Sequence, residues 1–180
     1  MTRNLRLFFA LWPTDAVRAQ LAAAAAPYAS FGRAIAARNL HVTLVFLGAI
    51  AQERLAAVLE SAQSMQKLTF DGKFSVHLDA VELWRRSGLI CLTAGQAPPE
   101  LLTIVGRLSA ELRERGFELH EHETFRPHVT LVRDVARGSK VAGAASVRWP
   151  VESFALVESK VGQRGSEYTV LEQWRLTLKA

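Results

Sequence analysis

The chain has 180 residues, and its 22 Lys and Arg against 17 Asp and Glu give a formal net charge of +5. Hydrophobic residues make up 49% and charged residues 22%, which excludes a disordered or collagen-like chain. The single cysteine, Cys91, excludes a disulfide framework and a Cys-rich zinc site. No run approaches the ~20 apolar residues of a membrane helix. We therefore predict a cytoplasmic protein with no membrane partner.

The first half of the chain reads as two strand-and-helix segments. The expected order is a strand over residues 3–12, a helix over 15–26, a loop over 28–39, a strand over 40–50 and a helix over 52–68. Thr14 or Asp15 can cap the first of these helices, and Pro27 ends it.

The second half begins with a hairpin and returns to strands at its end. The expected order is strands over residues 74–84 and 89–94, a helix over 98–115, a polar loop over 117–126, and strands over 127–135, 147–160 and 168–178. Gly116 ends the helix, and a glycine-containing turn at residues 162–165 joins the last two strands.

The tetrapeptide His-Val-Thr-Leu occurs twice, beginning at His41 and at His128, 87 residues apart. Each copy follows a strand and a helix, so the repeat indicates an internal duplication rather than chance. We predict an α+β fold in which two pseudo-symmetric lobes of mostly antiparallel sheet carry outer helices. Residues 1–180 would form a single domain with the active-site cleft between its lobes.

Both copies lie in apolar runs typical of strands. Side chains alternate between the faces of a strand, so each histidine shares a face with the threonine two residues later, whereas valine and leucine anchor the other face. If the lobes are related by a pseudo-twofold axis, both His-Thr faces line one cleft. Two imidazoles facing one substrate can serve as general acid and general base near neutral pH. A phosphodiester suits this arrangement, with the threonine hydroxyls holding the non-bridging oxygens and no metal required.

These motifs resemble those of the bacterial RNA 2′,3′-cyclic phosphodiesterase family, also called the 2′-5′ RNA ligase family, within the two-histidine phosphoesterase superfamily. The resemblance extends over nearly the whole chain. It includes residues 3–11, Asn39 to Leu44 with Phe46-Leu-Gly, Phe125 to Arg133, and the C-terminal Glu158-Ser, Gly165, Tyr168 and Trp174.

The resemblance implies hydrolysis of RNA 2′,3′-cyclic phosphate ends to 2′-phosphomonoesters without metal or other cofactor. By position in the motif, His41 would be the proton donor and His128 the proton acceptor. Thr43 and Thr130 would bind phosphate oxygens, as would Arg133. Because Arg133 is an odd number of residues from His128, a regular strand would point it away, so a strand end or a bulge must return it to the cleft.

Contacts with the rest of the RNA are predicted from aromatic and basic residues. Phe9 is our candidate for stacking on a base, and Arg126 for a further contact with base or RNA. Arginines and lysines outnumber acids on both flanks of the cleft, which suits an RNA backbone but equally describes a solvated surface.

Two other features are interpreted without a catalytic role. The run His120-Glu-His-Glu resembles a metal site, but we interpret it as a solvated mixture of charges on a polar loop. Cys91 lies among apolar neighbours and is expected to be a buried hydrophobe.

Alternative functions remain open from sequence alone. The same cleft could join RNA ends through a 2′-5′ linkage, or hydrolyse another phosphodiester such as a small cyclic nucleotide. A non-catalytic RNA-binding module is the alternative of another class, although binding needs no matched pair of imidazoles. We expect a monomer, because the cleft is complete within one chain.

Overall fold

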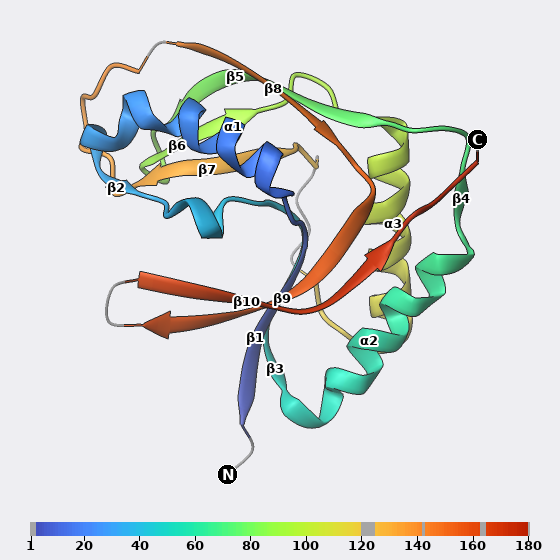
Figure 1. Cartoon of the computed structure of the whole chain (residues 1–180). Helices are drawn as coiled ribbons and strands as arrows, with labels where there is room; N and C mark the ends of the chain where they lie inside the picture. Colours follow the sequence, from blue (N-terminus) through green and yellow to red (C-terminus); the bar gives the residue numbers. More distant parts are fainter. Residues whose placement is uncertain (1–2, 120–124, 142, 163–164, 180) are drawn as a thin grey trace.

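The computed structural model describes residues 3–119, 125–141, 143–162 and 165–179 (Figure 1). The described strands form two antiparallel sheets and one short parallel pair. Helices lie outside the sheets, so the predicted α+β fold of antiparallel lobes with outer helices is confirmed.

The first sheet has the strand order β10-β9-β1-β3 and carries the first motif copy. Its strands are β1 (Asn4–Leu11), β3 (Val42–Ala51), β9 (Ser153–Gly162) and β10 (Gly165–Arg175). This sheet therefore combines strands from the two ends of the chain.

The second sheet has the order β2-β7-β6-β5-β8 and carries the second copy. Its strands are β2 (Arg33–Ala34), β5 (Ser75–Trp84), β6 (Leu89–Thr93), β7 (His128–Arg133) and β8 (Ala144–Pro150). The parallel pair joins β4 (Thr69–Phe70) to β11 (Thr177–Leu178).

The longer helices are α1 (Asp15–Ala25), α2 (Leu55–Gln63) and α3 (Pro99–Glu114). The Thr14 hydroxyl accepts a hydrogen bond from the Val17 backbone N–H at 3.4 Å, which confirms the predicted cap of α1. Short 3₁₀ turns extend two of these helices and shape the loops, at Ala26–Phe31, Ala37–Asn39, Gln52–Arg54 and Ser64–Lys67.

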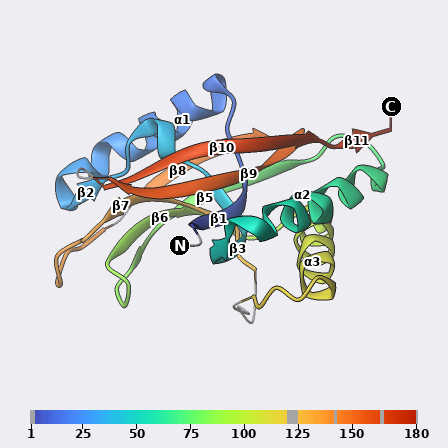
Figure 2. The same cartoon turned by 90° about the horizontal axis from the view of Figure 1, so that it is seen from below.

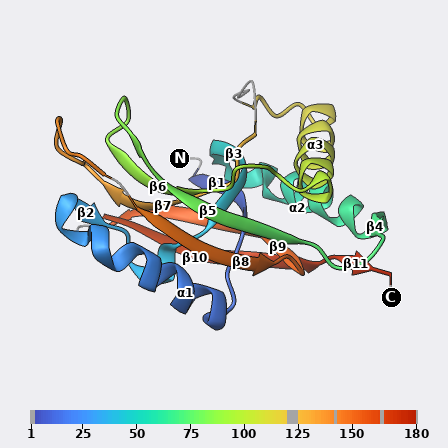
Figure 3. The ribbon, with the colours of Figure 1, turned by 90° about the horizontal axis from the view of Figure 1, so that it is seen from above.

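Helices α1 and α3 each pack against the sheet to which the strand before them does not belong. Helix α1 follows β1 of the first sheet but packs against β8 of the second, whereas α3 follows β6 of the second sheet but packs against β3 of the first and against α2. Views from below and above place α1 at the opposite end of the molecule from α2 and α3 (Figures 2 and 3). One large apolar cluster contains buried residues of both sheets and of all of these helices.

The C-terminal strands differ from the sequence prediction. The single strand expected over residues 147–160 is two strands, β8 and β9, which belong to different sheets. Pro150 ends β8, because proline cannot donate the backbone hydrogen bond that would continue a ladder. The break lets the chain leave the lobe of the second motif and return to the lobe of the first.

Candidate active site

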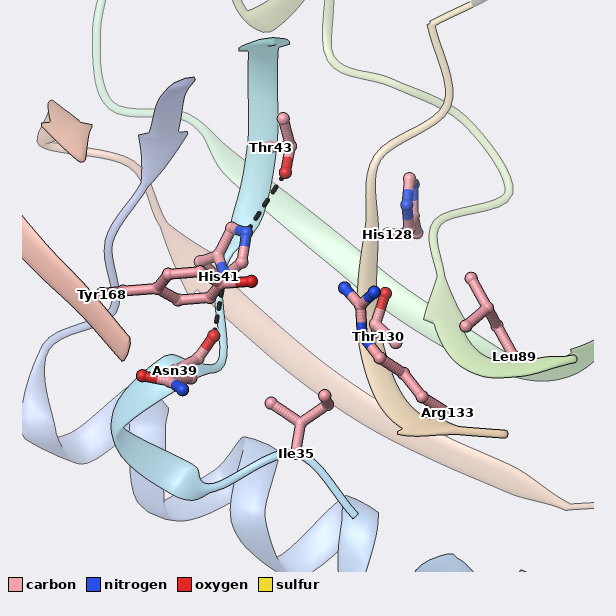
Figure 4. Close-up of a pocket in the computed structure, with 9 residues that line it drawn as sticks. All are labelled: Ile35, Asn39, His41, Thr43, Leu89, His128, Thr130, Arg133 and Tyr168. Carbon is pink, nitrogen blue, oxygen red and sulfur yellow. Dashed lines mark hydrogen bonds between the residues drawn. The ribbon is translucent and has the colours of Figure 1, made fainter. Parts of the chain in front are cut away.

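The two motif strands β3 and β7 approach each other and frame a pocket (Figure 4). The lining residues are Ile35, Asn39, His41, Thr43, Leu89, His128, Thr130, Arg133 and Tyr168. The structure thus brings both predicted His-Thr pairs, and the predicted arginine, to one pocket between the two sheets.

A β-bulge in β7 explains why Arg133 reaches this pocket. Thr130 pairs with Cys91 of β6, but Val132 pairs with Ile90, so Leu131 is an extra residue in β7. Leu131 and Val132 are consecutive buried residues, and Arg133 returns to the face of Thr130. Of the two expected ways of returning Arg133 to the cleft, a strand end or a bulge, the structure has the bulge.

The first motif contains the same irregularity at the same place. Thr43 pairs with Ala10 of β1, but Val45 pairs with Phe9, which leaves Leu44 as the extra residue. Leu44 and Val45 are again consecutive buried residues. The duplication therefore extends beyond the four repeated residues to the local backbone geometry.

Both imidazole rings are held by a carbonyl two residues earlier. His41 Nδ1 lies 2.7 Å from the Asn39 carbonyl oxygen, and His128 Nδ1 lies 2.9 Å from that of Arg126. A carbonyl can only accept, so Nδ1 of each ring carries the proton, and Nε2 is the nitrogen that can take up a further proton. In the first copy, His41 Nε2 lies 3.1 Å from the Thr43 hydroxyl oxygen, which can donate to the neutral ring.

Aromatic rings enclose His41. The ring centroids of Phe8, Trp12 and Tyr168 lie 4.9, 5.9 and 5.2 Å from that of His41. Burial lowers the pKa of His41 to about 4. The hydrogen bond to the Asn39 carbonyl raises this pKa but does not offset the effect of burial, and the positive charge of Arg133 lowers it further. His41 is consequently neutral at neutral pH when the pocket holds no anion.

His128 has different surroundings. The Trp84 ring lies against its imidazole, with centroids 4.5 Å apart. The side chain of Arg126 forms an ion pair with Glu82, with Arg126 Nη1 2.9 Å from Glu82 Oε2, and is absent from the pocket lining. A contact between Arg126 and RNA stays a prediction.

The prediction for Phe9 was wrong. Phe9 is fully buried and packs against Phe154 and Trp174, with ring centroids 6.1 and 6.0 Å away. Its neighbour Phe8 instead faces the His41 ring. Strand β1 lies inside its sheet between β3 and β9 and is buried on both faces from Leu7 to Leu11, so this part of its sequence does not reveal which phenylalanine packs against His41.

Sequence reasoning did not assign several pocket residues. Tyr168 reaches the pocket from β10, and Asn39 also lines it (Figure 4). The Asn39 side-chain N–H donates to the Ser166 carbonyl at 2.8 Å. Asn39 and Tyr168 both belong to the segments that carry the family resemblance, but neither was assigned a role in the pocket. Ile35 and Leu89 complete the apolar part of the wall.

Other chemically interesting residues have no place in this pocket. Cys91 is buried beneath Thr130, and burial raises the pKa of its thiol to about 12, so it is the expected inert hydrophobe. The acidic and histidine run at 120–123 lies outside the described residues. Among the residues that are described, no group of three or more His, Cys, Asp or Glu could hold a metal ion, and no helix is long and apolar enough to span a membrane.

Comparison with known proteins places this site in a family. The model of the 2′-5′ RNA ligase superfamily matches residues 9–163. The chain belongs to this superfamily. It is 29% identical over 180 residues to an RNA 2′,3′-cyclic phosphodiesterase of Escherichia coli, covering 98% of this chain and 99% of the relative. It is 31% identical over 184 residues to a Thermus thermophilus protein of the same name, covering 96% and 90%.

The fold agrees with the sequence comparison. The crystal structure of E. coli LigT complexed with 3′-AMP superposes with a TM-score of 0.84 at 29% identity, covering 97% of this chain and 99% of LigT. The resemblance inferred from the paired motifs is therefore confirmed at the level of the superfamily and of its fold.

Proposed function

We propose that this protein hydrolyses RNA ends that carry a 2′,3′-cyclic phosphate and releases 2′-phosphomonoesters. The observation that supports this most directly is the convergence of two His-Thr strands on one pocket, each histidine with Nδ1 tied to a carbonyl. Relatives that share about 30% of the sequence over nearly the whole chain are named for this activity.

The size of the pocket suits a terminal group. Its volume of about 190 Å³ is below the ~300 to 1,000 Å³ typical of pockets for larger ligands. A cyclic phosphate with part of its ribose fits such a space, and the rest of the RNA would extend outside. The whole chain would act as one domain, because each lobe supplies one histidine, and a monomer suffices.

In the proposed reaction, His128 Nε2 takes a proton from water as the water oxygen attacks phosphorus. The bond from phosphorus to the 3′ oxygen breaks, and His41 Nε2 gives its proton to that oxygen. Thr43, Thr130 and Arg133 would hold the non-bridging oxygens, where charge increases in the transition state. The bond formed is the new P–O bond to water, and the products are a 2′-phosphate and a free 3′ hydroxyl.

The low pKa of His41 adds one requirement to this scheme. A neutral His41 has no proton to donate, so substrate binding must raise its pKa. The negative charge of the cyclic phosphate next to Nε2 has that effect, because an adjacent anion favours the protonated ring. The Asn39 carbonyl on Nδ1 also favours the protonated form. The enzyme would therefore acquire its general acid together with its substrate.

The test uses an oligoribonucleotide that ends in a 2′,3′-cyclic phosphate, incubated with EDTA and with wild type or His41→Ala protein. We expect the wild type alone to give the 2′-phosphate, identified against authentic 2′- and 3′-phosphate standards. A 3′-phosphate product would reverse the assigned acid and base. Absence of conversion by wild type, or equal conversion by the variant, would contradict the proposal.

A further inference from the structure

Glu82 of β5 binds two side chains with its two carboxylate oxygens. Its Oε2 accepts hydrogen bonds from Arg126 Nη1 at 2.9 Å and from the Trp84 indole N–H at 3.1 Å. Its Oε1 accepts a further bond from Arg126 Nη2. The planar guanidinium thus meets the carboxylate in a two-pronged pair, which fixes orientation better than a single contact does.

The two residues that Glu82 holds are also the residues that hold His128. The Arg126 carbonyl accepts the hydrogen bond from His128 Nδ1, and the Trp84 ring lies against the imidazole. One carboxylate therefore connects the hydrogen-bonded side of the histidine to its packed side.

A third residue limits the movement of the guanidinium. Arg126 Nη2 lies 3.4 Å from the hydroxyl oxygen of Thr93, which is fully buried and donates to the Ala80 carbonyl at 3.3 Å. Thr93 is also the cross-strand partner of His128 on β6. The Arg126 side chain is therefore fixed to the same pair of strands that carries the histidine.

We propose that Glu82 is a positioning residue that fixes the ring of His128, acting through Arg126 and Trp84. The proposal rests on the proposed function, in which His128 Nε2 must point at the attacking water. Proton transfer requires a heavy-atom separation of ~2.6 to 3.2 Å, so a small rotation of the ring is costly for the reaction. Glu82 itself would exchange no proton with the substrate.

The Glu82–Arg126 pair makes only a small contribution to folding. Their side chains are 32% and 44% exposed, and ion pairs of this kind contribute ~0 to 1 kcal/mol. Hydrogen bonds from Arg126, followed by that from Trp84, lower the pKa of Glu82, so the carboxylate stays charged near neutral pH. We therefore expect its loss to affect turnover more than stability.

The test is a double-mutant cycle of Glu82→Ala and Arg126→Ala on the cyclic-phosphate oligoribonucleotide. We expect Glu82→Ala to lower kcat about 10-fold, less than the ~10²-fold cost of a ~1 Å misplacement, and to change KM little. The double variant should lose little more than either single variant, because the two residues act as one unit. Glu82→Gln, which keeps acceptor oxygen but not the charge, should recover part of the loss.

The control is Glu111→Ala, which breaks another Glu–Arg pair far from the pocket, on α3. Arg115 Nη1 lies 2.6 Å from Glu111 Oε2, and both side chains are about 30% exposed, close to the exposure of Glu82. This variant should show the same small change in Tm as Glu82→Ala but unchanged kcat. A raised KM with unchanged kcat in Glu82→Ala would instead indicate a role in RNA binding and overturn the proposal.

A second readout does not depend on activity. Long-range ¹H–¹⁵N NMR at about pH 8.5, where imidazoles are neutral, reports which ring nitrogen carries the proton. In wild type the His128 signals should show one tautomer with Nδ1 protonated, whereas Glu82→Ala should mix the tautomers and leave His41 unaltered. Unchanged His128 signals would overturn the inference. If wild type fails to hydrolyse the RNA, the proposed function fails, yet these spectra still decide the positioning role.

Discussion

The two copies of His-Val-Thr-Leu have the same backbone but different surroundings. Each strand has its bulge at the leucine, and each histidine donates Nδ1–H to a carbonyl two residues earlier. Around His41 the neighbours are aromatic rings, whereas His128 is held between Trp84 and a carbonyl belonging to an ion-paired arginine. Residues outside the repeat therefore decide how each imidazole differs from its counterpart.

This difference matters because an acid and a base must not be interchangeable. The repeated segment brings both histidines to one pocket, and on the proposed mechanism the non-repeated segments give each ring its own role in proton transfer. The aromatic enclosure of His41 makes its protonation depend on an anion in the pocket. On the proposed mechanism, one duplicated element thus performs two opposite halves of a proton transfer.

We expect the largest effect on activity when each of the two imidazoles is removed in turn. His41→Ala and His128→Ala should each lower kcat about 1,000-fold or more, because a positioned acid or base contributes ~10² to 10⁴-fold. Binding of the cyclic-phosphate end, measured by fluorescence anisotropy, should largely persist. Near-normal turnover by either variant would show that the copies do not work as a pair.

The two threonines offer the next largest effect. Thr43→Ala and Thr130→Ala should each reduce kcat/KM about 100-fold, the scale for losing one donor to developing negative charge. The matched Thr→Ser variants retain the hydroxyl and should stay near wild-type activity. Equal losses in the serine and alanine variants would mean that the methyl group, and not the hydroxyl, is what matters.

A smaller effect, on the pH dependence of kcat/KM, distinguishes the surroundings of His41 from those of His128. In the profile of kcat/KM against pH, the limb that reports the ionisation of His41 in the free enzyme should have its pKa near 4 in wild type, because burial lowers the pKa of His41 to about 4. Trp12→Ala admits water next to the ring, so the pKa should rise and the limb should move to higher pH. Trp84→Ala, at the other histidine, should leave this limb in place. If the limb stays in place in Trp12→Ala, the aromatic rings are not the cause of the low pKa of His41.

The smallest effect is on stability. The pKa of His41 is lower in the folded chain than its ordinary value of about 6.5, so the unfolded chain binds more protons between these values. His41 should therefore destabilise the fold as pH falls from about 6.5 toward 4, and should have no such effect above about 6.5. Thermal unfolding of wild type should be more sensitive to this acidification than that of His41→Ala. If the Tm of both proteins fell equally with pH, the lowered pKa of His41 would be contradicted.

The sequence predicted the features that depend on local pattern. The paired motifs and the strand and helix before each copy follow from spacing and alternation. The family resemblance placed Arg133 in the cleft, and alternation then required either a strand end or a bulge, of which the structure has the bulge. The residue of β1 that contacts His41 was predicted wrongly, because the strand is buried on both faces from Leu7 to Leu11 and shows no alternation there. Phe8, rather than Phe9, packs against the His41 ring.

Contacts between distant segments were also beyond the sequence pattern. Glu82 and Arg126 are 44 residues apart, and each alone reads as an ordinary surface charge. Tyr168 enters the pocket because β9 and β10 return to the first sheet, which depends on the break after Pro150. Such contacts depend on how strands from distant parts of the chain pair, and a short stretch of sequence does not reveal that pairing.

The interleaving of the chain has a consequence for synthesis on the ribosome. All strands of the sheet that holds His128 have been made once Pro150 has emerged, and α1, which packs on β8, is made long before. The sheet that holds His41 still lacks β9 and β10 at that moment, so β1 has β3 as its strand partner on one side only. Segments that are complete early can fold while translation continues. The lobe made from the middle of the chain can thus form first, and the N-terminal histidine acquires its full surroundings last.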